Sequence, residues 1–449
     1  MKILYVDKHA IKEAFKNGEI NVVVFGLGKL GLPLAAVIAS KGARVIGVDI
    51  NERLVERINN GENPLPNEPG LGELLSRVVG EGKLIATTDW EKAVKKGDVY
   101  IIIVPVVVDS IGKPKLDIIF DVVEKISLGL EKGDIVIIET TLPIGTTRRI
   151  AKILEERTGL KCGEDFGVAH APERTMSGRM IKDITGSYFK VVGADDERTL
   201  EAVGAFYEMI NSKGVIKVKS SITAEAVKVF EGVYRYVNIA LANELAIYAE
   251  KKGFDVMEAI RVANTQPYSH IHVPGAGVGG HCIPVYIRFV LYDALENRIS
   301  LQLMDAARRM NENMPLHTVL LTVKALNEIG KPVRGSKVLI VGVAYKPHIR
   351  EYYNSPAFRV IKELREMGAE LFVYDPIATD EDLGKLFNVP RWKGDNVDVA
   401  VILTGYPEFA EMIYEKKVQV KAIVDGRRLL DPEKVRSLGY VYKAIGLGL

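Results

Sequence analysis

Cysteine, glutamine and long hydrophobic runs are scarce in this chain of 449 residues. Two cysteines, Cys162 and Cys282, are too few for a disulfide framework and favour a reducing compartment. The three glutamines are typical of proteins from thermophiles, which avoid thermolabile residues. The longest apolar run, 100–108, is far shorter than the ~20 residues that a membrane-spanning helix needs. These absences exclude a disulfide scaffold and a transmembrane protein.

The chain also lacks a large excess of either positive or negative charge. The 60 Lys and Arg and the 58 Asp and Glu leave a net charge of +2, which argues against a nucleic-acid partner held by phosphate neutralisation. Hydrophobic residues make up 47% and supply several cores, which excludes a disordered chain. The first 20 residues mix charges throughout and lack a signal-peptide core, so we expect a cytoplasmic protein.

Short apolar runs alternate with helical patterns twice along the chain. The first series of runs lies at 21–26, 43–49, 98–105, 134–140, 166–172 and 188–193, and the second at 336–347, 369–376, 398–405 and 421–428. Continuous apolar strands separated by helices are typical of a parallel sheet covered on both faces. The sequence therefore predicts an α/β protein with two doubly wound, Rossmann-like domains.

Helical periodicity without proline joins the two series and runs from Thr223 to Asn264. Apolar residues at spacings of three and four predict a buried stripe on this helix. The stripe consists of Val227, Phe230, Tyr234, Val237 and Leu241. A helix of this length crosses between domains or builds a dimer interface. We predict Rossmann-like domains over 1–219 and 331–449 and a helical region over 220–330.

The segment GLGKLGLP directly follows the first apolar run and opens a helical pattern. Gly26 permits a tight turn, Gly28 lets backbone approach a pyrophosphate, and Gly31 lets helix and strand pack closely. A glycine triplet can also be an ordinary turn, but Asp49 ends the second strand at the spacing of a ribose-binding carboxylate. Because a carboxylate repels a 2′-phosphate, the sequence predicts NAD rather than NADP.

A second glycine-rich segment, GVGGHCIP, carries Cys282. A cysteine often fills a gap in a core. Glycine-dense loops permit close approach of a ligand instead, so a nucleophilic thiol is the other interpretation. His281 would lower the pKa of that thiol if it were protonated and close. Cys162 has no such setting and is predicted to be structural.

Polar side chains form a second stripe on the long helix, which consists of Lys228, Glu231, Arg235 and Asn238. The spacing places all four on one face of the helix. This face is either solvated surface or part of an active site in which Lys228 donates to a developing oxyanion. Further polar residues follow two strands, in the segments 139–147 and 170–174. Ligands of open α/β sheets bind beyond such strand ends, although caps and turns use the same residue types.

Taken together, these segments resemble the UDP-glucose/GDP-mannose dehydrogenase family. The resemblance covers nearly the whole chain and rests on GLGKLGLP, TLPIGTT, APER, AEAVK, GVGGHCIP and VGVAYKP, in the family's order and spacing. APER and GGHCIP are similar to the N-acetylhexosamine branch of the family. The resemblance implies oxidation of the C6 alcohol of a UDP-N-acetylhexosamine, foremost UDP-N-acetyl-D-mannosamine, to a carboxylate with two NAD.

The resemblance also implies the roles of individual residues. Cys282 would form a thiohemiacetal and then a thioester, Lys228 would stabilise the oxyanion, and Thr141 and Glu173 would position or activate water. The implied cofactor contacts are Gly26, Gly28, Lys29, Leu30, Gly31, Asp49, Pro105 and Thr141. The implied substrate contacts are Glu173, Arg174, Lys228, Gly279, Gly280, Lys346 and Arg427. No metal is expected, and the long helix would form the core of a homodimer in polysaccharide biosynthesis.

Four single positions depart from the family pattern, and the segment 104–107 reads VPVV where the family has VPTP. Gly232 replaces Asn, Tyr286 replaces Asp, and Tyr268 and Tyr353 replace Arg. A lost carboxylate beside Cys282 removes a candidate base, for which a tyrosine with an ordinary pKa near 10 is a poor substitute. Three alternatives therefore stay open: a dehydrogenase for another nucleotide sugar, a nucleotide-sugar binder without turnover, and a two-electron hydroxyacid dehydrogenase.

Overall fold

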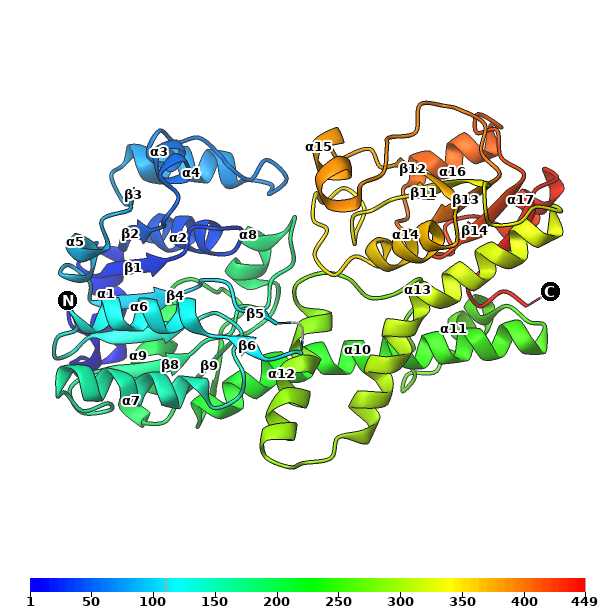
Figure 1. The fold of residues 1–449 in the computed structure, drawn as a ribbon. Coiled ribbons are helices and arrows are strands. Elements are labelled where there is room, and N and C mark those ends of the chain that lie inside the picture. The colour runs from blue at the N-terminus through cyan, green and yellow to red at the C-terminus, as the bar shows by residue number, and fades with distance from the viewer. Residues whose placement is uncertain (110, 449) are drawn as a thin grey trace. The chain divides into compact units, whose positions relative to one another are not determined.

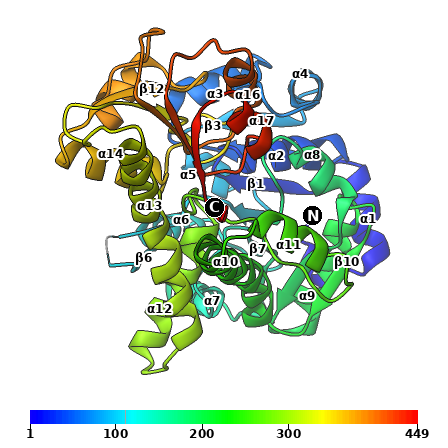
Figure 2. The same ribbon diagram turned by 90° about the vertical axis from the view of Figure 1, so that its right-hand side faces the viewer.

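The computed structural model describes residues 1–109 and 111–448. The chain divides into two compact units, unit 1 from Met1 to Glu231 and unit 2 from Gly232 onwards (Figures 1 and 2). Their boundary lies inside the long helix α10, Ser221–Lys252. The three-region division of the chain stays a prediction. No helix of the described residues is both long and apolar enough to cross a membrane.

Unit 1 is built on an eight-stranded sheet with the order β10-β9-β8-β7-β4-β1-β2-β3. Its strands are β1 Asn21–Phe25, β2 Arg44–Val48, β3 Leu84–Thr87, β4 Val99–Ile102, β7 Ile135–Ile138, β8 Gly167–His170, β9 Lys190–Ala194 and β10 Val215–Val218. A separate short hairpin pairs β5, Val107–Val108, with β6, Pro114–Lys115. The predicted doubly wound fold is confirmed, and β3 and β10 are strands that the apolar runs do not predict.

One strand pair in unit 1 departs from the predicted parallel arrangement, because β9 runs antiparallel to β8. A parallel return needs a crossover connection, usually a long helix. The segment between these strands holds only the short helices α8, Met180–Lys182, and η2, Asp183–Ser187. Neither helix is long enough to carry the chain back along the sheet, so β9 returns in the opposite direction.

Helices cover both faces of the unit 1 sheet because the strand side chains alternate. Val22 and Val24 of β1 point into one core, whereas Val23 and Phe25 point into the other. The first core is closed by η1 Ile3–Tyr5, α1 Lys8–Lys16, α2 Gly31–Ser40, α3 Glu52–Asn59, α4 Leu71–Gly80 and α9 Glu197–Glu208. The second is closed by α5 Trp90–Val94, α6 Asp117–Ser127 and α7 Thr146–Thr158.

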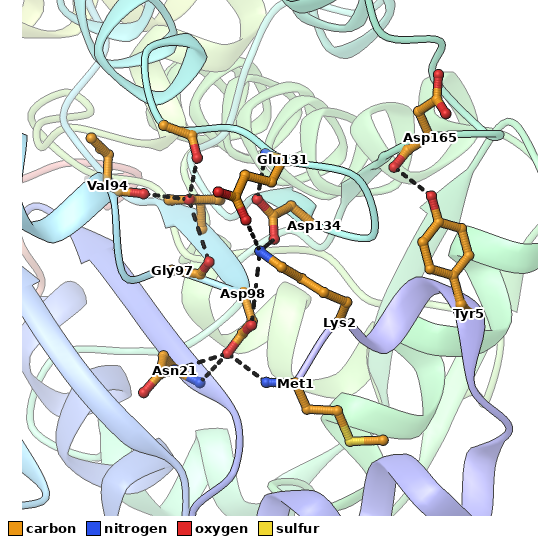
Figure 3. A network of polar contacts seen from close by, with 12 residues as sticks. Met1, Lys2, Tyr5, Asn21, Val94, Gly97, Asp98, Glu131, Asp134 and Asp165 are labelled. Carbon is orange, nitrogen blue, oxygen red and sulfur yellow. Dashed lines mark hydrogen bonds and ion pairs between the residues drawn. The ribbon is translucent and has the colours of Figure 1, made fainter.

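A network of charges ties the N-terminal segment to the amino ends of the unit 1 strands (Figure 3). Lys2 Nζ lies 2.7 Å from Asp134, 3.1 Å from Glu131 and 4.0 Å from Asp98. Asp98 also accepts from the backbone and side-chain nitrogens of Asn21 at 2.8 and 3.0 Å. Burial raises the pKa of Asp134 to about 6. This edge of the sheet is held together by charges and lies opposite to the carboxyl ends of the strands.

The long helix differs from its prediction in two ways. It ends at Lys252, and α11 runs from Val256 to Ala263. Gly253 adopts φ +83°, and the Asp255 carboxylate accepts from the N–H of Met257 to begin α11. The continuous helix to Asn264 was therefore a wrong prediction, because one glycine in the left-handed conformation and one capping aspartate divide it.

The predicted buried stripe of α10 was also wrong. Phe230, Tyr234 and Leu241 are 57%, 53% and 47% exposed in the single chain. The apolar residues of α10 that are buried within the chain are mostly smaller, and Tyr236, 3% exposed, is the large exception. The smaller ones are Ala224, Val229, Gly232, Val233, Ala240, Ala242, Ala246 and Ala249.

Unit 2 has a five-stranded parallel sheet with the order β12-β11-β13-β14-β15. Its strands are β11 Lys337–Val341, β12 Glu370–Tyr374, β13 Val399–Ile402, β14 Ala422–Asp425 and β15 Val441–Ala444. Its helices after α11 are α12 Ile283–Glu296, α13 Gln302–Glu328, α14 Ala357–Glu366, α15 Asp380–Asp382, η3 Leu383–Phe387, α16 Pro407–Tyr414 and α17 Pro432–Ser437. Alternate residues of β11 again point into two different cores.

Candidate active site

The glycine turn of unit 1 lies where the strand order reverses, between β1 and β4. Gly26 has φ +97°, and a Cβ there would lie 2.8 Å from the carbonyl oxygen of Ile103. A Cβ on Gly31 would overlap the carbonyl oxygen of Gly26. A Cβ on Gly28 would have no atom of the described residues within 4 Å. The backbone at Gly28 is thus open to an approaching phosphate, while the other two glycines permit the turn and the close packing.

Asp49 holds this turn from the end of β2. One carboxylate oxygen accepts from the N–H of Leu27 at 2.8 Å, and the other accepts from Asn51 at 2.9 Å. No side chain of the described residues caps the start of α2, where the N–H of Leu32 donates to the carbonyl of Gly28 at 3.1 Å. Lys29 and Pro105 are exposed at the same edge, and Leu30 is half-buried. These residues fit a bound dinucleotide.

The loops that follow β7 and β8 meet at the same edge of the sheet. The N–H of Glu173 donates to the carbonyl of Glu139 at 3.2 Å, which places the Glu173 loop beside the segment that carries Thr141. The Glu173 carboxylate accepts from the N–H of Thr175, and Thr140 Oγ1 donates to the carbonyl of Val104 at 2.8 Å. Thr141 and Glu173 are half-buried. Both predicted water-handling residues therefore lie on neighbouring loops of unit 1.

Glu225 of α10 joins these loops to the helix that carries Lys228. Its fully buried carboxylate accepts from the N–H of Gly145 at 2.5 Å and from the N–H and Oγ1 of Thr147 at 2.7 and 2.6 Å. Burial raises the pKa of this carboxyl. Lys228 lies three residues later on α10 and is half-buried. Sequence reasoning missed Glu225, although a charged residue between Ala224 and Val229 on a small apolar face is a recognisable signal.

The polar stripe of α10 is partly structural. Glu231 lies 2.5 Å from the guanidinium of Arg174, which links α10 to the loop after β8. Asn238 donates to the carbonyl of His270 at 2.8 Å and accepts from the N–H of His272 at 2.8 Å. Arg174 thus holds α10 and the Glu173 loop together, and Asn238 holds a loop of unit 2.

A cavity lies beside the Glu173 loop and is lined by a buried ion pair that sequence reasoning missed. Lys190 Nζ lies 2.6 Å from the fully buried carboxylate of Glu139, which also accepts from the hydroxyl of Tyr207. Burial raises the pKa of Glu139 and of Tyr207. Burial and the charge of Lys190 lower the pKa of His170 to about 3, so this histidine is neutral.

In unit 2 the side chain of Cys282 is exposed at the start of α12. The loop before it is pressed against the segment after β11. Gly280 has φ +97° and donates its N–H to the carbonyl of Tyr353 at 2.8 Å. A Cβ on Gly279 would lie 2.6 Å from the Cβ of Tyr345. The glycines therefore permit this close contact, and the thiol is not part of a core.

The predicted substrate residues Lys346 and Arg427 follow β11 and β14, at the carboxyl edge of the unit 2 sheet. Lys346 is exposed. Arg427 Nε donates to the carbonyl of Leu403 at 2.7 Å, and a Cβ on Gly275 would lie 2.7 Å from Arg427 Nη1. Burial lowers the pKa of Arg427 to about 10, so it stays charged at neutral pH. The thiol loop and a cation suited to a diphosphate thus pack against each other within one unit.

Two departures from the family pattern form one packing unit. A Cβ on Gly232 would lie 2.5 Å from Cδ2 of Tyr286, so the tyrosine ring occupies the space of a side chain at 232. Tyr286 is 9% exposed, whereas Tyr268 is 89% exposed. The glycine at position 232 therefore makes room for the tyrosine ring at position 286.

The described residues contain no group of three or more His, Cys, Asp or Glu side chains that could hold a metal ion. Cys162 is half-buried, and burial raises the pKa of its thiol to about 12. A thiol with that pKa is protonated and inert at neutral pH, as expected for a structural cysteine.

Comparison with known proteins identifies the family. Three models of the UDP-glucose/GDP-mannose dehydrogenase family match in order: the NAD binding domain over 20–211, the central domain over 222–313 and the UDP binding domain over 339–432. The cofactor that fits the glycine turn is therefore NAD.

Individual relatives agree over nearly the whole chain. The UDP-N-acetyl-D-mannosamine dehydrogenase of Pyrococcus horikoshii is 36% identical over 96% of this chain and 100% of its own length. The structure of UDP-D-ManNAc dehydrogenase from the same organism has a TM-score of 0.85 at 34% identity, covering 95% of this chain and 99% of the other. The NDP-N-acetyl-D-galactosaminuronic acid dehydrogenase of Methanosarcina mazei reaches 0.84 at 29% identity, with 98% of both chains covered. The chain thus belongs to the UDP-glucose/GDP-mannose dehydrogenase family.

Proposed function

We propose that the protein oxidises the C6 alcohol of UDP-N-acetyl-D-mannosamine to the carboxylate, with two NAD consumed per sugar. The observation that carries the proposal is the exposed thiol of Cys282, in the segment that matches the central domain, on a loop that packs against Arg427 of the segment that matches the UDP binding domain. The names of the relatives at 36% and 34% identity support this sugar. The scarcity of glutamine favours assays at elevated temperature.

The proposed chemistry assigns a role to residues of both units. The glycine turn at Gly26, Gly28 and Gly31 would hold NAD, which would supply the hydride acceptor for each of the two oxidations of C6. The alcohol proton leaves in the first oxidation, and the thiolate of Cys282 then adds to the aldehyde carbon, forming a C–S bond. Loss of the second hydride gives a thioester, and water breaks the C–S bond to release the carboxylate and the thiol.

The remaining residues bind and orient. Lys228 donates to the oxygen that gains negative charge when the thiolate or water adds. Glu173 and Thr141 hold the water that attacks the thioester, and Arg174 and Glu225 keep their loops and α10 in place. Arg427 and Lys346 hold the diphosphate, for which the planar guanidinium supplies two parallel donors.

The direct test replaces the thiol. Cys282→Ala is expected to abolish uronate formation, while Cys162→Ala, which removes the inert cysteine, retains it. Product is measured as uronate by mass spectrometry together with NADH absorbance. Unchanged uronate formation by the Cys282→Ala variant would contradict the thioester scheme.

A nucleotide-sugar binder without turnover is the second candidate, because Tyr286 occupies the space beside Gly232. A packed aromatic ring offers no base at neutral pH. Tight binding of NAD and of UDP-N-acetyl-D-mannosamine by calorimetry, with no NADH formed, would favour this candidate over the dehydrogenase.

We further propose a cytoplasmic homodimer that forms through the exposed apolar face of α10. Phe230, Tyr234, Leu241 and Tyr248 are between 47% and 57% exposed along this helix. Apolar side chains of this size in one row are typical of a surface that a partner covers. The chain of 49.5 kDa is expected to run at twice that mass in light scattering, and Leu241→Asp is expected to lower the mass to that of one chain.

A further inference from the structure

Two ion pairs with buried carboxylates flank β7 of unit 1, one at each end of the strand. Asp134 precedes the strand and lies 2.7 Å from Lys2 Nζ (Figure 3). Glu139 follows the strand and lies 2.6 Å from Lys190 Nζ. Lys190 is more deeply buried than Lys2. Because desolvation offsets the attraction within a buried pair, such a pair by itself adds little net stability.

The pair at the carboxyl end of β7 is also bonded to the Glu173 loop. Lys190 Nζ donates to the carbonyl of Pro172, the residue before Glu173, at 3.3 Å. The carbonyl of Glu139 accepts from the N–H of Glu173 at 3.2 Å. Glu139 thus meets the loop through its own backbone and, by way of Lys190, through its side chain. Because Thr141 lies two residues after Glu139, the pair joins the segments of both residues proposed to hold water.

The direction of β9 explains why these residues meet. β9 runs antiparallel to β8, so the residues that begin β9 lie beside those that follow β8. The hydroxyl of Tyr188 donates to the carbonyl of Arg174 at 2.5 Å, and Arg174 Nη1 donates to the carbonyl of Phe189 at 3.2 Å. Together with Lys190, these bonds fasten both sides of Glu173 to the start of β9.

The position of the Lys190 ammonium is fixed by a third group. Its Nζ lies 4.7 Å from the centre of the Tyr207 ring, and the Tyr207 hydroxyl donates to the Glu139 carboxylate. Burial raises the pKa of Tyr207, so this phenol is a neutral donor. The ammonium is therefore held by a carboxylate, an aromatic ring and the carbonyl of the loop.

We propose that Lys190, paired with Glu139, is a positioning residue that holds the Glu173 loop beside the Thr141 segment for hydrolysis of the thioester. The inference deepens the proposed function, on which it rests for the water that these two residues hold. Lys190 acts through the carbonyl of Pro172 and not on the reacting atoms.

The step that depends on this placement is the attack of water. The oxygen of water bonds to the thioester carbon, and the C–S bond breaks with its electron pair going to sulfur. One proton of water passes to the sulfur and the other to solvent, which leaves a carboxylate and the thiol. The hydride steps do not use the held water, so we expect them to be unaffected by the loss of Lys190.

The first readout is the lifetime of the thioester. Lys190→Met keeps a long side chain but removes the charge and the donor. With enzyme in excess of UDP-N-acetyl-D-mannosamine and with NAD present, samples are quenched in acid and the acylated chain is followed by intact-mass spectrometry. Its decay is expected to be about tenfold slower in Lys190→Met, because a misplaced group holds water poorly. The rate of NADH formation in that turnover and the KM for the sugar are expected to stay at parent values.

The second readout requires no turnover. Hydrogen exchange of 173–175 is measured by mass spectrometry without NAD or sugar. The N–H of Thr175 donates to the Glu173 carboxylate, so its exchange reports where that carboxylate lies. Lys190→Met is expected to speed this exchange about tenfold. Lys190→Arg, which can donate to both the carboxylate and the carbonyl, is expected to restore both readouts toward parent values.

Lys2→Met is the matched control, because it removes the lysine of the other ion pair on β7. It is expected to lower the melting temperature while both readouts stay at parent values. If Lys190→Met does not fold, Lys190→Met combined with Glu139→Gln replaces it, because no buried carboxylate is then left without its cation. The double variant is expected to fold and to show the faster exchange and the slower decay.

Parent values of exchange and of thioester decay in a folded Lys190→Met protein would overturn the inference. Equal changes in Lys2→Met and Lys190→Met would also overturn it, since the effect would then be one of general stability. Failure of the proposed function looks different. A parent protein that forms no uronate, while Lys190→Met still speeds the exchange, would reject the dehydrogenase and keep the hold of Lys190 on the loop.

Discussion

The first strand of each sheet leads into the same turn in both units. Gly26 after β1 has φ +97°, and Gly342 after β11 has φ +85°. In each unit an aspartate at the end of the neighbouring strand holds the turn. Asp49 accepts from the N–H of Leu27 at 2.8 Å, and Asp375 accepts from the N–H of Val343 at 2.9 Å.

The two units differ in the segment after this turn. In unit 1, α2 begins at Gly31, the backbone at Gly28 is open, and Asp49 is half-exposed. In unit 2, α14 begins only at Ala357, and Asp375 is 1% exposed and accepts from the hydroxyl of Tyr406 at 3.1 Å. The open backbone and the half-exposed aspartate that suit a dinucleotide are thus found at the turn of unit 1, which matches the NAD binding domain. In unit 2 the longer loop carries instead the side chains that hold the thiol loop.

The largest expected effects come from the glycines of unit 1. Gly31→Ala is expected to abolish NAD binding and to lower the melting temperature, because its Cβ would overlap the Gly26 carbonyl. Gly28→Ala is expected to weaken NAD binding by about tenfold, or 1.4 kcal/mol, without a change in stability, since its Cβ meets only the space for phosphate. Calorimetric titration and melting curves separate the two. If Gly31→Ala and Gly28→Ala lowered stability equally, the distinction between the two glycines would be contradicted. Gly80→Ala is the control, because a Cβ at Gly80 on α4 also meets open space.

Replacing Asp375 is expected mainly to lower stability, whereas replacing Asp49 is expected mainly to lower NAD affinity. Asp375→Asn removes an acceptor from a buried network and is expected to destabilise the protein by about 3 kcal/mol, with NAD affinity unchanged. Asp49→Asn is expected to lower NAD affinity about tenfold with a smaller loss of stability, because a carboxylate binds ribose hydroxyls better than an amide. Chemical denaturation and NAD titration measure both. Loss of NAD affinity in Asp375→Asn would show that the comparison is wrong.

A smaller effect is expected at Glu225, which joins α10 to the start of α7. In Glu225→Gln one amide N–H must face the N–H of Gly145 or of Thr147, so one bond is lost and one donor is left unpaired. We expect a loss of about 2 kcal/mol in stability and a lower kcat with KM little changed. Thr147→Val, which removes only the side-chain donor, is the milder control. Wild-type kcat in a folded Glu225→Gln protein would exclude its positioning role.

The smallest expected effect is on the pH dependence of folding stability, through His170. The pKa of His170 is about 3 in the folded chain, against an ordinary value near 6.5. The unfolded chain binds the extra proton below about pH 6.5, so stability is complete above that pH and is lost as pH falls toward 3. Between about pH 7.5 and 5.5 the loss is expected to be about 1 kcal/mol. His170→Gln should remove that part of the pH dependence in denaturation curves, whereas an unchanged dependence would assign it to other groups.

Features that depend on local backbone geometry were predictable from the sequence, whereas the roles of the residues stay predictions. The turn at Gly26, the carboxylate of Asp49 and the exposed thiol of Cys282 are indicated by strand–turn–helix spacing and by glycine density. The buried face of α10 was not predictable, because its large and its small apolar residues recur with the same helical period. Periodicity alone does not tell which stripe packs within the chain.

Contacts between residues that lie far apart in the sequence could not be predicted either. The pair Glu139–Lys190 joins residues 51 positions apart in sequence, and the His281–Glu351 pair joins residues 70 apart. Neither spacing is a local pattern, so only the fold brings them together. The antiparallel β9 has a similar origin, since its direction depends on the absence of a long helix between 170 and 190.

The account is tested most directly by the number of NADH formed per sugar at elevated temperature, with limiting UDP-N-acetyl-D-mannosamine and excess NAD. UDP-N-acetylglucosamine and UDP-glucose are measured in parallel. We predict two NADH and one carboxylate per molecule of UDP-N-acetyl-D-mannosamine. One NADH per sugar with an aldehyde as product, or no NADH with any of the three sugars, would contradict the account.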